Sequence, residues 1–139
     1  MSAKGSVPGI GTIGLGILVA VGLWSGAWLS WRQFLSGEAC PLLGPIPACY
    51  LALGGYVLMA AAATTRFTRR LRRGNRSRAN QVFWMGWAVA GGLALVGRIM
   101  ESIRGDICPR IVVPLCYVSL ASCALIGLLY MRITRALDS

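Results

Sequence analysis

The chain has 139 residues, of which 56% are hydrophobic and 13% are charged, and its formal net charge is +10. A soluble domain carries about 25% charged residues, so this is the composition of a membrane protein. The chain has no histidine, which removes the commonest haem, zinc and copper ligand and the usual acid–base group near neutral pH. Only four acidic residues are present. We therefore expect no metal, no cofactor and no ion path.

Four uncharged stretches are long enough to cross a membrane, namely residues 5–31, 41–65, 79–97 and 111–131. About 20 apolar residues span the hydrocarbon core of a bilayer. The sequence therefore predicts an all-α membrane protein with four transmembrane helices in a single domain, residues 1–139. The first stretch is longer than a signal-peptide core of about 7–15 residues, so we expect an uncleaved anchor.

The first helix is predicted over residues 9–34. Trp24, Trp28 and Trp31 lie on one face near its end, as expected of an aromatic belt at a membrane surface. Gly22 and Gly26 form a G-x-x-x-G step that lets another helix approach closely. This step serves either packing within the bundle or docking to another membrane subunit.

The remaining helices follow from the proline and charge pattern. Pro41, Pro45 and Pro47 disfavour helix, so the second helix begins near residue 47 or 49 and continues to about 69. Residues 70–80 are predicted to form a loop, because Gly74 and Asn75 are a turn signal. The third and fourth helices are expected over residues 81–102 and 114–137.

The basic residues are concentrated on one side of the predicted membrane. With four spans, ten of the 14 basic residues lie on the side of the termini and the 70–80 loop. The positive-inside rule places this side, with both termini, in the cytoplasm, and we predict the bacterial inner membrane. A short basic loop between two spans explains the charge without nucleic acid, and it also attracts anionic lipid headgroups. The arginines in question are Arg66, Arg69, Arg70, Arg72, Arg73, Arg76 and Arg78.

The two halves of the chain repeat one another, which indicates tandem duplication of a helical hairpin. We assign residues 9–70 to the first unit and residues 81–137 to the second, joined by the basic loop. The matching segments are residues 37–41 (GEACP) and 105–109 (GDICP), 47–51 (PACYL) and 114–118 (PLCYV), and 66–69 (RFTR) and 132–135 (RITR).

Four cysteines, Cys40, Cys49, Cys108 and Cys116, lie in or beside the two loops on the opposite, periplasmic side. Disulfides form and persist there, and the repeat favours the pairs Cys40–Cys49 and Cys108–Cys116. Three interpretations remain open: structural clips, catalytic thiol–disulfide exchange and metal binding. Metal binding is the weakest of these, since Cys ligands usually stand about two to four residues apart. Cys123 stands alone and is expected to pack as a small hydrophobic residue.

Four helices with cytoplasmic termini and paired cysteines in the outer loops resemble the quinone-linked disulfide-forming oxidases of bacteria. More distantly, the topology resembles that of the vitamin K epoxide reductases. The resemblance implies a membrane thiol–disulfide oxidoreductase with a bound quinone and with Cys40, Cys49, Cys108 and Cys116 as its redox residues. It concerns topology alone, because those families have a C-x-x-C pair and this chain has none.

The preferred prediction is non-catalytic. Small size, clipped loops, glycine-rich helices and few chemical groups favour an accessory or scaffolding subunit of a larger inner-membrane complex. Respiratory, photosynthetic or oxidoreductase complexes are the candidates, and membrane lipids and other integral membrane subunits are the expected partners. The quinone-linked oxidoreductase is the alternative.

Overall fold

The computed structural model describes residues 9–37, 40, 42–68, 73–105 and 115–139. Four helices make up almost all of this part of the chain: α1 (Ile10–Ser36), α2 (Ala48–Thr68), α3 (Arg73–Arg104) and α4 (Leu115–Asp138). Each is long and apolar enough to cross a membrane. The prediction of four transmembrane helices is therefore confirmed at this level, and the chain is a multi-pass membrane protein.

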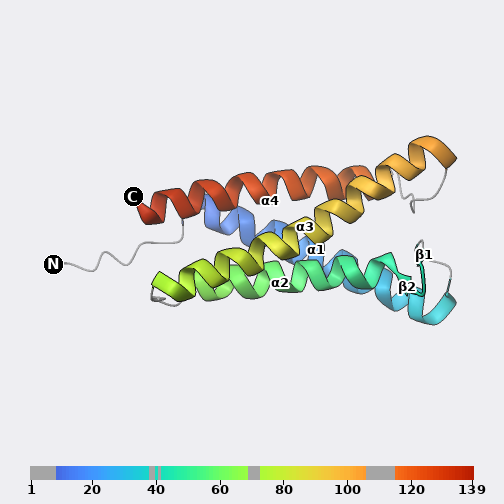
Figure 1. Ribbon diagram of the computed structural model, residues 1–139, viewed down its shortest axis with the longest axis horizontal. Coiled ribbons are helices and arrows are strands. Elements are labelled where there is room, and N and C mark those ends of the chain that lie inside the picture. Colours follow the sequence, from blue (N-terminus) through green and yellow to red (C-terminus); the bar gives the residue numbers. More distant parts are fainter. Residues whose placement is uncertain (1–8, 38–39, 41, 69–72, 106–114) are drawn as a thin grey trace.

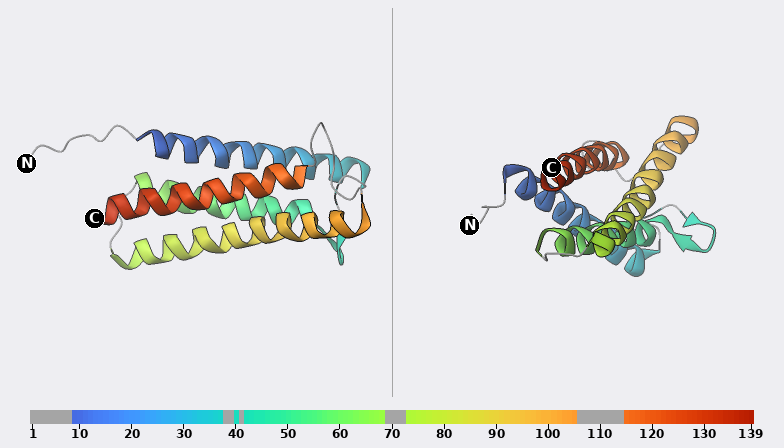
Figure 2. Two further views of the ribbon diagram at one scale, coloured as in Figure 1. Left: turned by 90° about the horizontal axis from the view of Figure 1, so that it is seen from above. Right: turned by 60° about the vertical axis from the view of Figure 1, so that its left-hand side comes forward.

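The helices run up and down in chain order and close into a bundle (Figures 1 and 2). Each helix packs against the next one in the chain, and α4 returns to pack against α1. The start of α1 and the end of α4 lie at one end of the bundle, which we call the terminal end. The opposite end carries β1 and β2, and we call it the hairpin end.

The start of α3 departs from the sequence prediction. Residues 70–80 were expected to form a loop, but α3 begins at Arg73 and includes Gly74 and Asn75. Arginine is a good helix former, and one interior glycine costs only about 1 kcal/mol relative to alanine. That cost is too small to end a helix that continues directly into a membrane span. As a result, Arg76 and Arg78 stand on a helix and not in a loop.

A short β-hairpin interrupts the expected all-α architecture between α1 and α2. It pairs β1 (Leu42–Leu43) with β2 (Ile46–Pro47) in antiparallel register. Gly44 has a φ of 65° at the first central position of the turn, and Pro45 follows it. A glycine with positive φ in this position is typical of a two-residue type II′ turn.

The core is a stripe of apolar side chains in the centre of the bundle. All four helices contribute to it, because each presents a row of residues about one turn apart to the bundle axis. The largest fully buried side chains are Leu15, Met59, Phe83, Cys123, Ile126 and Tyr130.

The closest helix contact is between α2 and α3, where glycine meets glycine. A Cβ atom placed on Gly86 would lie 2.5 Å from the carbonyl oxygen of Gly55, and one on Gly55 would lie 2.8 Å from that of Gly86. Neither position accepts a side chain without separating the helices. Apolar burial contributes little between helices in lipid, so this backbone contact is a main source of their association.

The helix α1 changes its packing partner along its length (Figure 1). Towards the hairpin end, Gly22 lies against the ring of Tyr56 and Gly26 against Leu53, both on α2. The G-x-x-x-G step of α1 therefore packs within the bundle and is not available for docking another subunit.

Towards the terminal end, α1 turns instead to α4. Gly11 faces Ile133, and Gly14 faces Leu129. Near the hairpin end α1 packs against α2, and near the terminal end it packs against α4. The helices α1 and α2 therefore diverge towards the terminal end.

The helices α1 and α3, which both run from the terminal end to the hairpin end, end in the same way. Gly37 after α1 and Gly105 after α3 have φ values of 73° and 77°. Their N–H groups donate to the carbonyl oxygens of Gln33 and Glu101, at 2.8 and 2.9 Å. A left-handed glycine is the usual way to end a helix, because it has no Cβ to clash.

Candidate functional site

The first predicted cysteine pair is bonded in the structure. Cys40 and Cys49 form a disulfide with their Cα atoms 6.0 Å apart, within the range that a bridge requires. The bond ties the segment after α1 to the first turn of α2. Cys108 lies outside the described residues, as does the side chain of Cys116 at the start of α4. The predicted Cys108–Cys116 pair therefore stays a prediction.

A buried glutamine supports the disulfide from α1. The side-chain oxygen of Gln33 accepts the Cys40 N–H at 2.8 Å, and its nitrogen donates to the carbonyl oxygen of Gly37 at 2.9 Å. Both functional groups of a buried amide are thus satisfied, as its desolvation demands. Cys40 itself is 8% exposed. Sequence reasoning missed Gln33, because nothing local to α1 shows that its partner lies seven residues ahead.

A cluster of two ion pairs lies at the terminal end of the bundle. Arg66, whose side chain is 4% exposed, donates through Nη2 to both carboxylate oxygens of Asp138 on α4, at 2.8 and 2.9 Å. Arg76 on α3 lies 3.7 Å from the same carboxylate. One acid thus joins three helices. The sequence placed Arg66 among the charges that set topology, and it gave no sign that Asp138 reaches it.

Most of the other predicted arginines lie outside the part of the chain that the structure describes. Arg78 is exposed near the start of α3. Arg69, Arg70 and Arg72 lie outside the described residues, and so does the side chain of Arg73.

Cys123 takes part in two polar contacts inside the bundle at mid-span. The Tyr56 hydroxyl lies 3.7 Å from the Cys123 sulfur, and the indole N–H of Trp87 donates to the Cys123 carbonyl oxygen at 2.7 Å. The predicted packing role of Cys123 agrees with its burial at 1% exposed. These contacts satisfy polar atoms where lipid offers no partners.

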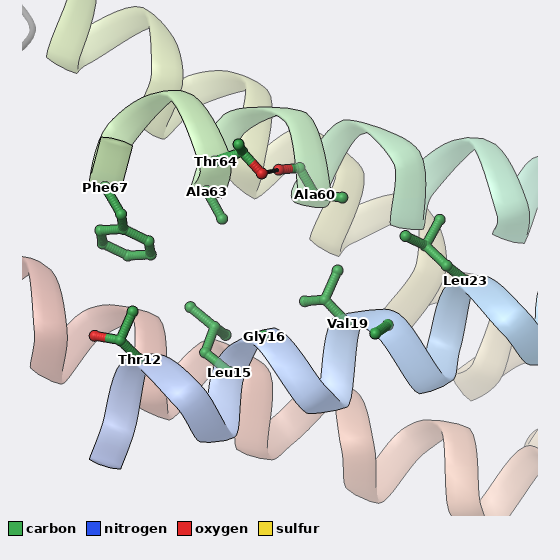
Figure 3. Close-up of a pocket in the computed structure, with 10 residues that line it drawn as sticks. Thr12, Leu15, Gly16, Val19, Leu23, Ala60, Ala63, Thr64 and Phe67 are labelled. Atoms are coloured by element: carbon green, nitrogen blue, oxygen red, sulfur yellow. Dashed lines mark hydrogen bonds between the residues drawn. The ribbon is translucent and has the colours of Figure 1, made fainter. Parts of the chain in front are cut away.

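Where α1 and α2 diverge, they leave a cavity of about 340 Å³ (Figure 3). We call it the α1–α2 groove. Its floor is formed by Leu15 and Val19, which are buried, and Phe67 closes it towards the terminal end.

The rim of the groove consists of small residues at helical spacing. Thr12, Gly16 and Ala20 stand one turn apart along α1, and Ala60 and Thr64 stand one turn apart on α2. Gly16, Ala20 and Thr64 are exposed, so the groove opens on the side that faces lipid. Sequence reasoning singled out the glycines that pack internally and overlooked this second row, although its four-residue spacing was visible.

The groove and the disulfide lie in different halves of the bundle. Eleven positions of α2 separate Cys49 from Ala60, which corresponds to about 16 Å along a helix.

The chain matches no protein-family model, and no curated protein or solved structure is significantly similar to it. Its function has to be argued from its own geometry.

Proposed function

We propose that this protein is a small accessory subunit that binds a transmembrane helix of a larger inner-membrane complex in the α1–α2 groove. The observation that carries the proposal is the groove itself, with its exposed rim of small residues. Small residues at four-residue spacing let the backbone of a further helix approach closely, which is how helices associate in lipid. A lipid chain has no need of such periodic spacing.

The exposure of α1 supports the same proposal. Apolar side chains lie exposed along its whole length at spacings of three and four residues, and its span is the least buried of the four. This face does not line the groove but runs next to its α1 rim, and it reaches the hairpin end, where the three exposed tryptophans lie. The exposed row consists of Ile10, Ile13, Ile17, Val21, Trp24, Trp28, Trp31 and Leu35.

The proposal includes a fixed orientation in a bacterial inner membrane. The terminal end, which carries most of the basic residues, lies in the cytoplasm, and the hairpin end lies in the periplasm. There the Cys40–Cys49 disulfide persists and holds the adjoining ends of α1 and α2 together.

We further propose that the chain arose by duplication of one helical hairpin. The matching glycine caps support this, because Gly37 and Gly105 occupy equivalent positions of the repeat and have nearly equal φ values. Gln33 and Glu101, whose carbonyl groups accept the two cap bonds, are both buried.

A photo-cross-linking experiment tests the docking proposal. A photoreactive residue at position 16 should cross-link, in native membranes, to one membrane protein that co-purifies in constant ratio. Ala60→Leu should abolish the cross-link by filling the groove from the opposite wall. Gly92→Leu is the matched control, because a Cβ at Gly92 has no neighbour within 4 Å and its helix, α3, does not line the groove.

Three outcomes decide the question. A cross-link that Ala60→Leu removes and Gly92→Leu preserves supports the proposal. A lone monomer, or cross-links to lipid only, contradicts it. Reversible cycling of the Cys40–Cys49 bond with a thioredoxin-like partner favours the quinone-linked oxidoreductase instead.

A further inference from the structure

A second cavity, of about 320 Å³, lies between α2 and α3 at the terminal end. We call it the α2–α3 pocket. Its walls are apolar, and three polar residues, Thr65, Asn75 and Arg78, lie among its lining residues. The apolar residues that line it are Ala61, Ala62, Ala79 and Val82.

The arginines around this end have different partners. Arg66 and Arg76 share the carboxylate of Asp138. Arg78 forms no hydrogen bond or ion pair with any residue in the described part of the chain. The side-chain amide of Asn75 likewise has no hydrogen-bond partner among those residues.

Arg78 and Asn75 are three residues apart on α3, so their side chains leave the same face of the helix. Both line the pocket. A cation and an amide donor without partners thus stand together at the edge of an apolar surface, a combination that suits a phosphate group joined to a hydrocarbon chain.

The position of the pocket relative to the membrane surface fits the same ligand. Arg78 is the last charged residue before the uncharged stretch 79–97, so it stands where the membrane-spanning part of α3 begins. The apolar walls extend from there into the hydrocarbon region. Basic pockets between transmembrane helices on this side of a membrane are suited to anionic lipid headgroups.

We propose that the α2–α3 pocket binds one anionic phospholipid. Its phosphate lies against the guanidinium of Arg78 and the amide of Asn75, and an acyl chain lies on Ala61 and Val82. This site is separate from the α1–α2 groove and does not rest on the docking proposal. It also goes beyond general attraction to the basic loop, because it assigns the lipid to one arginine.

The test uses the purified full-length chain in nanodiscs made of equal parts phosphatidylglycerol and phosphatidylcholine. Lipids that stay bound after transfer to mild detergent are counted by native mass spectrometry. One basic residue near a membrane surface contributes about 1 kcal/mol, so Arg78→Gln should lower retained phosphatidylglycerol about fivefold. Arg132→Gln is the matched control, because it removes the same charge from an exposed position on α4 at the same end.

A second variant separates the pocket from its charge. Ala61→Leu fills the cavity at an exposed position and leaves every charge in place, so it should also lower retention of phosphatidylglycerol. Millimolar inorganic phosphate should not displace the lipid, since the apolar walls hold the chain. Displacement by phosphate would show a simple anion site and would overturn the proposal.

Two further results would also overturn it. One is an equal loss in the Arg78→Gln and Arg132→Gln proteins, which would indicate diffuse charge. The other is equal retention of phosphatidylcholine, which would indicate no headgroup preference. Unchanged midpoints of thermal unfolding for the Arg78→Gln and Ala61→Leu proteins in phosphatidylcholine verify that the fold is intact.

Discussion

The two sides of α2 are packed in opposite ways. Towards α3, Gly55 and Gly86 bring the two backbones into direct contact. Towards α1, contact is close only near the hairpin end, where Gly22 and Gly26 meet side chains of α2, and the other half opens into a groove. The difference shows that a small residue alone does not decide which helix approaches it. Gly11 and Gly14 are just as small, but they bring α1 to α4.

The largest effect is expected at the contact between α2 and α3. Gly86→Leu places four carbon atoms where a single Cβ already overlaps the Gly55 carbonyl, so α2 and α3 must separate. We expect no monodisperse folded protein in detergent, by size-exclusion chromatography and circular dichroism. Gly92→Leu, on the open face of the same helix, should elute and unfold like the wild type. Equal behaviour of the two variants would show that the glycine contact does not hold the bundle together.

A smaller effect is expected where the disulfide joins α1 to α2. Replacing both Cys40 and Cys49 by serine should cost about 2–3 kcal/mol of unfolding free energy, the value for closing so short a loop. Hydrogen exchange should rise at the adjoining ends of α1 and α2 and stay unchanged around Gly55 and Gly86. Reduction of the wild type should reproduce the loss. Faster exchange on both sides of α2 would mean that the two sides are coupled.

The smallest effect is expected at Gly22. The three atoms nearest to a Cβ there all belong to the ring of Tyr56, a side chain, whereas the contact at Gly86 is with a backbone carbonyl. Gly22→Ala should therefore cost about 1–2 kcal/mol, as typical overpacking does, in reversible unfolding measured by denaturant titration in micelles. The cost should shrink in a Tyr56→Leu background. Gly16→Ala is the control, because its added methyl group meets nothing within 4 Å. A cost that persists without the Tyr56 ring would refute this assignment.

The sequence was sufficient to predict the spans, because long uncharged stretches have few other uses. It failed at Arg73, because the pattern of loop residues does not reveal that a helix can extend beyond the membrane. It also missed the contacts of Gln33 and of Arg66 with Asp138. The second of these joins residues 72 positions apart, and such a pairing depends on how the helices pack. The same is true of the groove, since spacing shows that a row of small residues exists but not which face it occupies.

The tryptophans have a consequence for spectroscopy. Trp24, Trp28 and Trp31 are largely exposed on α1. Trp84 and Trp87 sit edge to face with centroids 5.4 Å apart, and Trp87 is anchored to a carbonyl oxygen of α4. The intrinsic fluorescence is thus the sum of two populations of indoles. A brominated lipid should quench the α1 population more strongly than the half-buried Trp84 and Trp87, so that the emission that remains is weighted towards the contact of α3 with α4.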